Sequence, residues 1–208
     1  FDPSHPVVRL HEPTFGAEEI KAAVNTLLST KVTSGKSVIE FEESFSKKVK
    51  LSNCVSSNSG SSANLLAVSS ICNPDYKYHL KEGDEVIVSA LSWSTTVWPL
   101  IQNKLIPVIV DIDLDTLNIS IEEVKKAINP KTKAIMPVHV YGNPCNMSEL
   151  ISICKENNLV LIEDCCEALG AEYNNEPVGT LGSVGTFSFY FSHHITTLEG
   201  GITVTDDD

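Results

Sequence analysis

Short apolar runs alternate with segments of helical periodicity along most of the chain. Runs rich in strand-forming residues predict strands at residues 54–57, 85–89, 106–110, 134–138, 160–163, 186–190 and 202–205. Between many of them, apolar residues at helical spacing predict helices at 61–70, 95–103, 121–128 and 147–157. Several strands are almost continuous in Val, Ile and Leu, which is typical of strands covered by helices on both faces. The pattern therefore predicts an α/β fold with a largely parallel sheet.

The first 50 residues do not follow this alternation. A loop at Thr33-Ser-Gly35 precedes an amphipathic helix near residues 38–49. We expect residues 1–50 to form an N-terminal arm that packs on a main domain of residues 51–208. The chain begins without Met and stops at Asp208 directly after an apolar run, so we also expect it to be part of a longer protein.

The composition restricts the class of partner. The 208 residues, 42% of them hydrophobic, suffice for one substantial core. A net charge of −12 argues against a nucleic-acid groove or an anionic membrane surface, because both require clustered Lys and Arg. No run of about 18 apolar residues occurs, and the N-terminus lacks the pattern of a signal peptide. We expect a cytoplasmic protein without nucleic-acid or membrane partners.

The cysteines do not form a recognisable metal motif. They occupy positions 54, 72, 145, 154, 165 and 166, with no C-x-x-C pair and no zinc-ribbon spacing. We interpret most of them as small buried apolar residues rather than ligands or disulfide partners. The vicinal pair Cys165-Cys166 is the exception, because its arrangement could serve a function.

A Gly and Ser cluster, Asn58-Ser-Gly-Ser-Ser-Ala-Asn-Leu-Leu66, lies where a predicted strand meets a predicted helix. Amides at a helix N-terminus, together with the hydroxyls of Ser61 and Ser62, suit a phosphate group. The same residues also suit an ordinary Ser N-cap. The α/β order favours the phosphate site, because ligands of such folds bind beyond the carboxyl ends of parallel strands.

A hydrophobic strand delivers two acids at its end in Val160-Leu-Ile-Glu-Asp-Cys-Cys-Glu-Ala-Leu-Gly170. A carboxylate there can pair with a protonated ring nitrogen and keep it cationic, as an electron-sink cofactor requires. Asp164 is the candidate for this role. The alternative is that it is a helix cap or a surface carboxylate.

Two further segments add an indole and two imidazoles. Trp93, in Ala90-Leu-Ser-Trp-Ser-Thr-Thr96, follows a predicted strand, where its indole could stack on a planar cofactor ring or lie in the core. His193 and His194 lie in Ser192-His-His-Ile195. Such a pair is often structural or metal-binding, but no third ligand at a suitable spacing supports a metal.

In this order the four segments resemble the sugar aminotransferase family of fold-type-I pyridoxal-phosphate enzymes, in particular its histidine-bearing dehydratase branch. The similarity extends over nearly the whole chain, from the Thr33-Ser-Gly35 loop through Gly83-Asp-Glu-Val-Ile87 to Glu199-Gly-Gly201. It implies a three-layer α/β/α large domain with a mostly parallel mixed sheet. The family's C-terminal small domain is expected to be absent from this chain.

The resemblance implies a role for each candidate residue. The implied cofactor-binding positions are Gly60, Ser61, Ser62, Trp93, Asp164, Glu167 and Ser188. The Gly-Ser-Ser stretch and Ser188 would hold the cofactor phosphate, Trp93 would stack on the ring and Asp164 would pair with the pyridine nitrogen. Glu167 would lie near the ring hydroxyl. His193 occupies the position of the family's lysine, so the cofactor, pyridoxal or pyridoxamine 5′-phosphate, would be held non-covalently.

The resemblance also implies a reaction. The amine-form cofactor would condense with the C4 ketone of a nucleotide-linked 4-keto-6-deoxy sugar, for which GDP-4-keto-6-deoxymannose is the expected substrate. His193 would act as general base at the cofactor's C4′ carbon, and the C3 hydroxyl would leave. L-glutamate would then restore the amine form. The implied product is a deoxysugar for lipopolysaccharide O-antigen, and the implied assembly is a homodimer.

Three alternatives remain open at this stage. A second histidine-bearing branch uses an iron–sulfur cluster and a partner reductase, and Cys166 matches one of its cluster cysteines; the segment around Trp93 favours the branch without a cluster. A 4-keto-sugar aminotransferase that tolerates histidine is the second alternative. The third is a truncated, catalytically silent binding domain.

Overall fold

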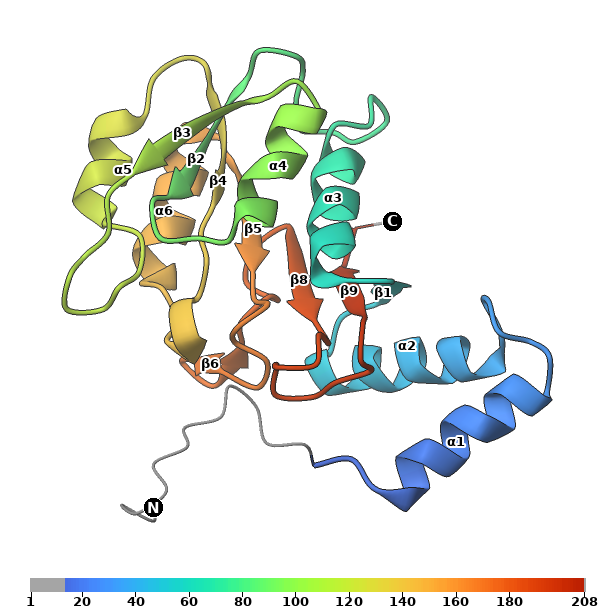
Figure 1. Ribbon diagram of the computed structural model, residues 1–208. Helices are drawn as coiled ribbons and strands as arrows, with labels where there is room; N and C mark the ends of the chain where they lie inside the picture. The colour runs from blue at the N-terminus through green and yellow to red at the C-terminus, as the bar shows by residue number, and fades with distance from the viewer. Residues whose placement is uncertain (1–13, 208) are drawn as a thin grey trace, which may run out of the picture.

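The computed structural model describes residues 14–207, in which seven strands form one mixed sheet (Figure 1). The strand order is β1-β9-β8-β5-β4-β2-β3. The bounds are β1 Asn53–Ser57, β2 Glu85–Ser89, β3 Ile106–Val110, β4 Thr132–Met136, β5 Val160–Asp164, β8 Val184–Ser188 and β9 Gly201–Thr205, and a small hairpin joins β6 Glu172–Tyr173 to β7 Glu176–Pro177. Strands β3, β2, β4, β5 and β8 pair in parallel, whereas β9 runs antiparallel to both β8 and β1. The predicted mostly parallel sheet is confirmed.

Helices cover both faces of this sheet and make three layers. Helices α3 (Gly60–Ile71) and α4 (Ser94–Gln102) lie on one face, and α5 (Ile121–Ala127) and α6 (Met147–Asn157) lie on the other. The alternation of side chains along β2 shows the arrangement: Val88 packs in the α3 and α4 layer, whereas Ile87 packs in the α5 and α6 layer. A short 3-10 turn, Val140–Gly142, follows β4.

The two N-terminal helices differ in how many of their residues are buried. Helix α2 (Lys36–Val49) packs Phe45 and Val49 into a cluster with residues of β8 and β9, such as Phe187 and Ile202. Helix α1 (Ala17–Leu28) buries none of its residues, although its apolar side chains recur at helical spacing. Helix α1 is not among the predicted helices, although this periodic spacing is a signal for it. Residues 1–13 of the predicted arm lie outside the described part.

Two strand predictions were displaced by two residues, and one apolar strand is only partly buried. Strands β4 and β8 begin and end two residues earlier than predicted, because the chain remains buried past their ends, for example at Val138 and Phe189. The hydrophobic residues of the sequence therefore do not show where the hydrogen-bonded pairing of a strand ends. Strand β3 is not covered on both faces: Ile106 and Ile109 are exposed because this strand lies at the edge of the sheet.

The structure describes all six cysteines, and each is free. Cys145, Cys154 and Cys165 are buried, while the others are half-buried. Burial raises the pKa of both the Cys145 and the Cys154 thiol to about 12, so these two thiols stay protonated and behave as small apolar groups. None of the helices between residues 14 and 207 is both long and apolar enough to cross a bilayer.

Candidate active site

The carboxyl ends of β2, β5 and β8, together with that of β1, meet at one edge of the sheet, here called the carboxyl edge. Figure 1 shows the arrowheads of β5 and β8 pointing to this edge beside the start of α3. The predicted candidates lie at the last residues of these strands or on the loops and helix starts that follow them. Ligands of parallel α/β sheets bind at such an edge.

The first turn of α3 combines an N-cap with free amides. The Ser59 side chain accepts a hydrogen bond from the Ser62 amide at 3.1 Å, and the two hydroxyls lie 3.2 Å apart. Ser59 is thus an N-cap, as the alternative interpretation requires, and its side chain occupies the Ser62 amide. The amides of Gly60 and Ser61 belong to the first turn, whose N–H groups have no partner inside the helix. These amides are available to an anion.

Gly60 brings this turn against the end of β8. A Cβ at position 60 would lie 2.5 Å from the Ser188 Cβ and 2.9 Å from the Cys166 Sγ. A side chain here would push the helix start away from Ser188, so only glycine permits the close approach. The Ser188 hydroxyl accepts from the Tyr190 amide at 3.3 Å. Helix amides beside a serine hydroxyl suit a phosphate group.

Asp164 lies at the end of β5, buried and surrounded by donors. Its Oδ2 accepts hydrogen bonds from Asn64 Nδ2 at 2.9 Å and from Thr96 Oγ1 at 2.8 Å. Its Oδ1 accepts from the Cys166 amide at 3.2 Å. The surface-carboxylate alternative is wrong, because the residue is only 3% exposed. Asn64 and Thr96 lie within the segments that sequence analysis singled out, but it assigned them no role.

Glu167 and Asp164 both lie within electrostatic reach of His193. Burial lowers the pKa of the half-buried His193, the charges of Glu167 and Asp164 raise it, and His194 lowers it. Glu167 is held by the Tyr141 amide, which donates to its Oε2 at 3.0 Å. The arrangement places an imidazole that can act as a base beside the buried carboxylate.

Trp93 and Ser61 lie at the same edge, and their side chains are exposed to solvent. Trp93 is the N-cap residue of α4 and is 71% exposed, so the core alternative for its indole is wrong. Its carbonyl accepts from the Thr96 amide at 3.0 Å, which ties it to the turn that reaches Asp164. The exposed indole offers a flat face to a planar ring. The Ser61 side chain is also exposed.

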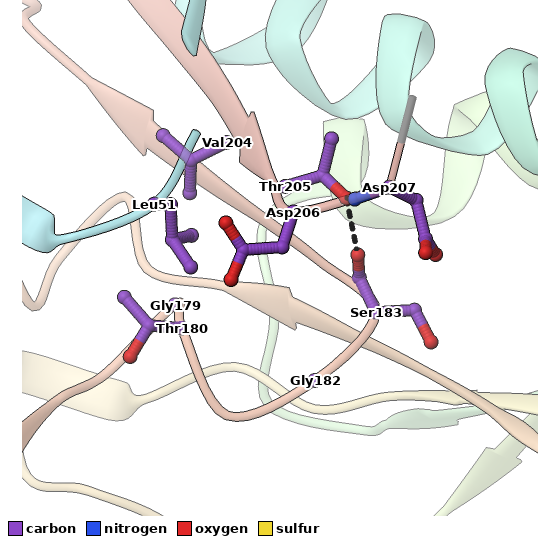
Figure 2. Close-up of a pocket in the computed structure, with 9 residues that line it drawn as sticks. All are labelled: Leu51, Gly179, Thr180, Gly182, Ser183, Val204, Thr205, Asp206 and Asp207. Carbon is purple, nitrogen blue, oxygen red and sulfur yellow. Dashed lines mark hydrogen bonds between the residues drawn. The ribbon is translucent and has the colours of Figure 1, made fainter. Parts of the chain in front are cut away.

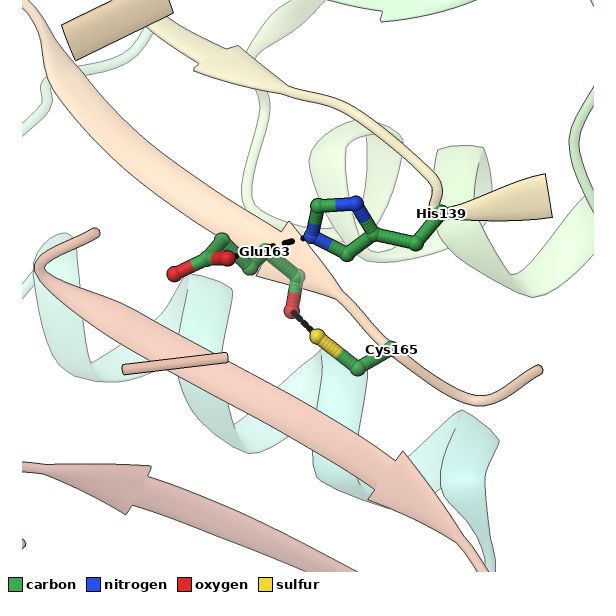
Figure 3. Close-up of side chains that lie close together, drawn as sticks. All are labelled: His139, Glu163 and Cys165. Atoms are coloured by element: carbon green, nitrogen blue, oxygen red, sulfur yellow. Dashed lines mark hydrogen bonds and ion pairs between the residues drawn. The ribbon is translucent and has the colours of Figure 1, made fainter. Parts of the chain in front are cut away.

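Glu163, the neighbour of Asp164, points to the opposite face of β5 and binds the loop at 179–182. Figure 3 shows it beside His139. Its Oε1 accepts from the amides of Leu181 and Gly182 at 2.7 and 2.6 Å. Its Oε2 accepts from the Gly179 amide at 2.8 Å and contacts His139 Nε2 at 3.1 Å. We call this arrangement the Glu163 clamp. Sequence analysis did not predict it, although the period of two along a strand separates neighbouring side chains.

The Glu163 clamp also answers whether His139, Glu163 and Cys165 form a metal site, since their ligand atoms lie within 4.8 Å of one another. The Cys145 amide donates to His139 Nδ1 at 3.0 Å, so Nε2 carries the proton and donates to Glu163. Burial raises the pKa of the Cys165 thiol well above its usual range. Both imidazole nitrogens and both carboxylate oxygens are occupied, so the cluster is structural.

Two cavities lie at the opposite edge of the sheet. One, of about 120 Å³, is lined by residues that include Gly182, Ser183 and Thr205, and the Thr205 hydroxyl donates to the Ser183 carbonyl at 2.8 Å (Figure 2). The other, of about 440 Å³, lies beside Tyr76 and Lys155. No predicted site residue lines either cavity. The convergent polar groups, rather than cavity size, therefore locate the candidate site at the carboxyl edge.

Comparison with known proteins shows relatives in sequence and in fold. The model of the DegT/DnrJ/EryC1/StrS aminotransferase family matches residues 13–208. Over 199 residues the chain is 45% identical to the GDP-4-keto-6-deoxy-D-mannose 3-dehydratase of Escherichia coli O55:H7, a match that covers 96% of this chain and 51% of the relative. The chain thus spans about half the length of that relative.

Two solved structures are similar to the chain. One is E. coli GDP-4-keto-6-deoxy-D-mannose-3-dehydratase with bound hydrated PLP, with a TM-score of 0.91 and 45% identity over 95% of this chain and 51% of that one. The other is GDP-4-keto-6-deoxymannose-3-dehydratase with a trapped PLP-glutamate geminal diamine, with a TM-score of 0.90 and 44% identity over 96% of this chain and 51% of that one.

Proposed function

The chain belongs to the DegT/DnrJ/EryC1/StrS aminotransferase family, and from this premise we propose that the whole protein is a pyridoxamine-phosphate-dependent sugar 3-dehydratase. The expected substrate is a nucleotide-linked 4-keto-6-deoxy sugar, with GDP-4-keto-6-deoxymannose as the first candidate. One observation carries the proposal: the segment after Ser188 holds His193 and His194 and no lysine. The 45% identity to a 3-dehydratase supports the same reaction.

The residues at the carboxyl edge fit pyridoxal or pyridoxamine 5′-phosphate. The α3 amides at Gly60 and Ser61, with Ser188, would hold the phosphate. Asp164 would face the ring nitrogen and Trp93 the ring plane. When bound, the cofactor supplies an amine for the C4 ketone of the sugar and a ring that accepts electrons. Ser62 and Glu167 complete the proposed set.

The chain's own contribution to the reaction is proton transfer and orientation. His193 would accept a proton at an imidazole nitrogen, because its lowered pKa keeps it neutral near physiological pH. The same imidazole would then return a proton to the departing C3 hydroxyl. Overall, the sugar loses one oxygen at C3, and L-glutamate is oxidised to 2-oxoglutarate with release of ammonia, which balances atoms and electrons. We further propose that the protein acts in the cytoplasm as a homodimer.

Ammonia and product mass, measured together, test the proposal. The complete protein is incubated with pyridoxamine 5′-phosphate, L-glutamate and GDP-4-keto-6-deoxymannose. We expect ammonia in equal amount to a sugar nucleotide that has lost its C3 oxygen. Without L-glutamate, turnover should stop after one equivalent of bound cofactor. A sugar that keeps its C3 oxygen would contradict the dehydratase.

A 4-aminotransferase is the second candidate, which the name of the family favours. In that case the nitrogen of glutamate would appear in a 4-amino sugar, and no ammonia would be released. A catalytically silent domain would neither bind the cofactor nor turn over. The same incubation therefore separates the three functions.

A further inference from the structure

A chain of buried side chains surrounds Asp164 and joins three elements. Asn64 of α3 and Thr96 of α4 both donate to Asp164 Oδ2, and Thr186 of β8 donates to Asn64 Oδ1 at 2.6 Å. Thr186 is the register partner of Asp164 across β5 and β8. Asn64, Thr96 and Thr186 are at most 1% exposed. We call these three residues with Asp164 the Asp164 network.

The hydrogen bonds of Asn64 fix the direction of its amide. Its Oδ1 accepts from Thr186, and its Nδ2 reaches both Asp164 Oδ2 and the Thr95 carbonyl, the latter at 3.3 Å. Rotating the amide by half a turn would bring its oxygen against the Asp164 carboxylate, with no proton between them. The Thr186 hydroxyl thus acts on Asp164 through Asn64.

The two oxygens of Asp164 are consequently unequal. Oδ2 accepts two short hydrogen bonds from Asn64 and Thr96, whereas Oδ1 accepts a longer one from the Cys166 amide. The Cys166 thiol also forms a hydrogen bond with this carboxylate. Two donors on one oxygen fix the rotation of the carboxylate. A carboxylate held in place in this way is a fixed acceptor for an N–H group of a cationic ring.

We propose that Asn64, Thr96 and Thr186 are positioning residues that hold the Asp164 carboxylate with Oδ1 toward the cofactor's ring nitrogen and keep that nitrogen protonated. This inference rests on the proposed function, because it requires the cofactor to bind beside Asp164. It assigns a role to three side chains that the resemblance to the family did not identify.

Substitutions of threonine test the contribution of the hydroxyl independently of the packing of the methyl group. Thr96→Val keeps the shape but removes the donor to Oδ2, and Thr96→Ser restores the donor. Thr186→Val is a second variant, one step further from the carboxylate. Thr203 provides the matched control, because its hydroxyl is also buried but donates to the Ala63 carbonyl, at 3.0 Å, and does not touch Asp164.

The measurement uses the complete protein with pyridoxal 5′-phosphate labelled with ¹⁵N at the ring nitrogen, and no sugar. The ¹⁵N chemical shift reports protonation of that nitrogen, and a titration gives the cofactor's Kd. In Thr96→Val we expect the shift to move toward the unprotonated value and the Kd to rise roughly tenfold. Thr186→Val should move both in the same direction but less. Thr96→Ser and Thr203→Val should resemble the wild type.

The outcomes distinguish this inference from the proposed function. An unchanged ¹⁵N shift in both Thr96→Val and Thr186→Val would overturn the inference and leave the proposed function intact. Equal losses in Thr96→Ser and Thr96→Val would also overturn it, because packing rather than the donor would then be responsible. A wild-type protein that does not bind the cofactor would overturn the proposed function, and this inference with it.

Discussion

At the scale of single residues, His193 and His194 are neighbours in the chain but have different surroundings. His193 is half-buried and feels the charges of Glu167 and Asp164, whereas His194 is exposed. The sequence identified the pair but could not separate its members by burial. Only the resemblance to the family assigns the role to His193, and the charges of Glu167 and Asp164 act on this imidazole.

Replacement of each histidine by asparagine tests this difference. His193→Asn removes the proposed base, so turnover should fall on the order of 10²- to 10⁴-fold. His194→Asn should keep near wild-type turnover at about pH 8, where His193 is neutral in both proteins. Ammonia release under saturating substrate is the measurement. Equal losses in the two variants would show that the base is not specifically His193.

The pH dependence of kcat/KM follows from the surroundings of His193. Burial lowers its pKa below the ordinary 6.5, so the neutral base persists below that pH and activity falls only as the pH drops through the lowered pKa. His194→Asn removes a positive neighbour and should move the acid limb to higher pH. Glu167→Gln removes a charge that raises the pKa and should move it to lower pH. Identical acid limbs in all three proteins would contradict the assignment.

At the scale of an element, β5 sends two adjacent acids to opposite faces of the sheet. Asp164 enters the Asp164 network beside α3 and α4, and Glu163 forms the clamp with His139 and the loop at 179–182. The sequence predicted the strand, and it offered Asp164 rather than Glu163 as the candidate partner of a ring nitrogen. It did not predict the clamp, because the amides that bind Glu163 come from a loop about 16 residues further along the chain.

Glu163→Gln tests the clamp. A glutamine at this position would place an NH₂ donor against backbone amides that now donate to the carboxylate. We expect the free energy of unfolding to fall by about 3 kcal/mol, as is typical when buried donors lose a charged acceptor. Urea denaturation provides the measurement.

Glu149→Gln is the matched control for the clamp. Its carboxylate also lies close to a partner, Lys125 Nζ at 2.6 Å, but both side chains are about half exposed. The expected loss is less than about 1 kcal/mol, because surface ion pairs contribute little. If the two substitutions cost the same, the buried clamp does not stabilise the loop.

At the scale of the whole molecule, the core continues from the sheet into α2 but not into α1. Phe45 of α2 stacks edge-on against Phe187 and Phe189, with ring centroids 5.3 and 5.8 Å apart. Val24, in the middle of α1, is 47% exposed. Within residues 14–50 of the predicted arm, α2 therefore packs into the core and α1 does not, although both helices show helical periodicity.

Truncation of each side chain tests this difference. Phe45→Ala should lower the free energy of unfolding by about 3–5 kcal/mol, because it leaves a cavity among aromatic rings. Val24→Ala should change it by no more than about 0.5 kcal/mol in this chain, because surface substitutions have small effects. Thermal and urea unfolding measure both variants. A large loss from Val24→Ala would show that α1 packs against the domain.

The α/β order and most element bounds could be predicted from the sequence, because they depend on local periodicity, and the candidate residues were proposed from motifs of adjacent residues. Residues such as Gly60, Asp164 and His193 could be named from those motifs. Tertiary structure alone decided the partners of these residues. Asn64 and Thr96 reach Asp164, and Thr186 reaches Asn64, only because α3, α4, β5 and β8 converge at one edge of the sheet. Hydrogen bonds between residues about 70 to 120 positions apart leave no periodic signal in the chain.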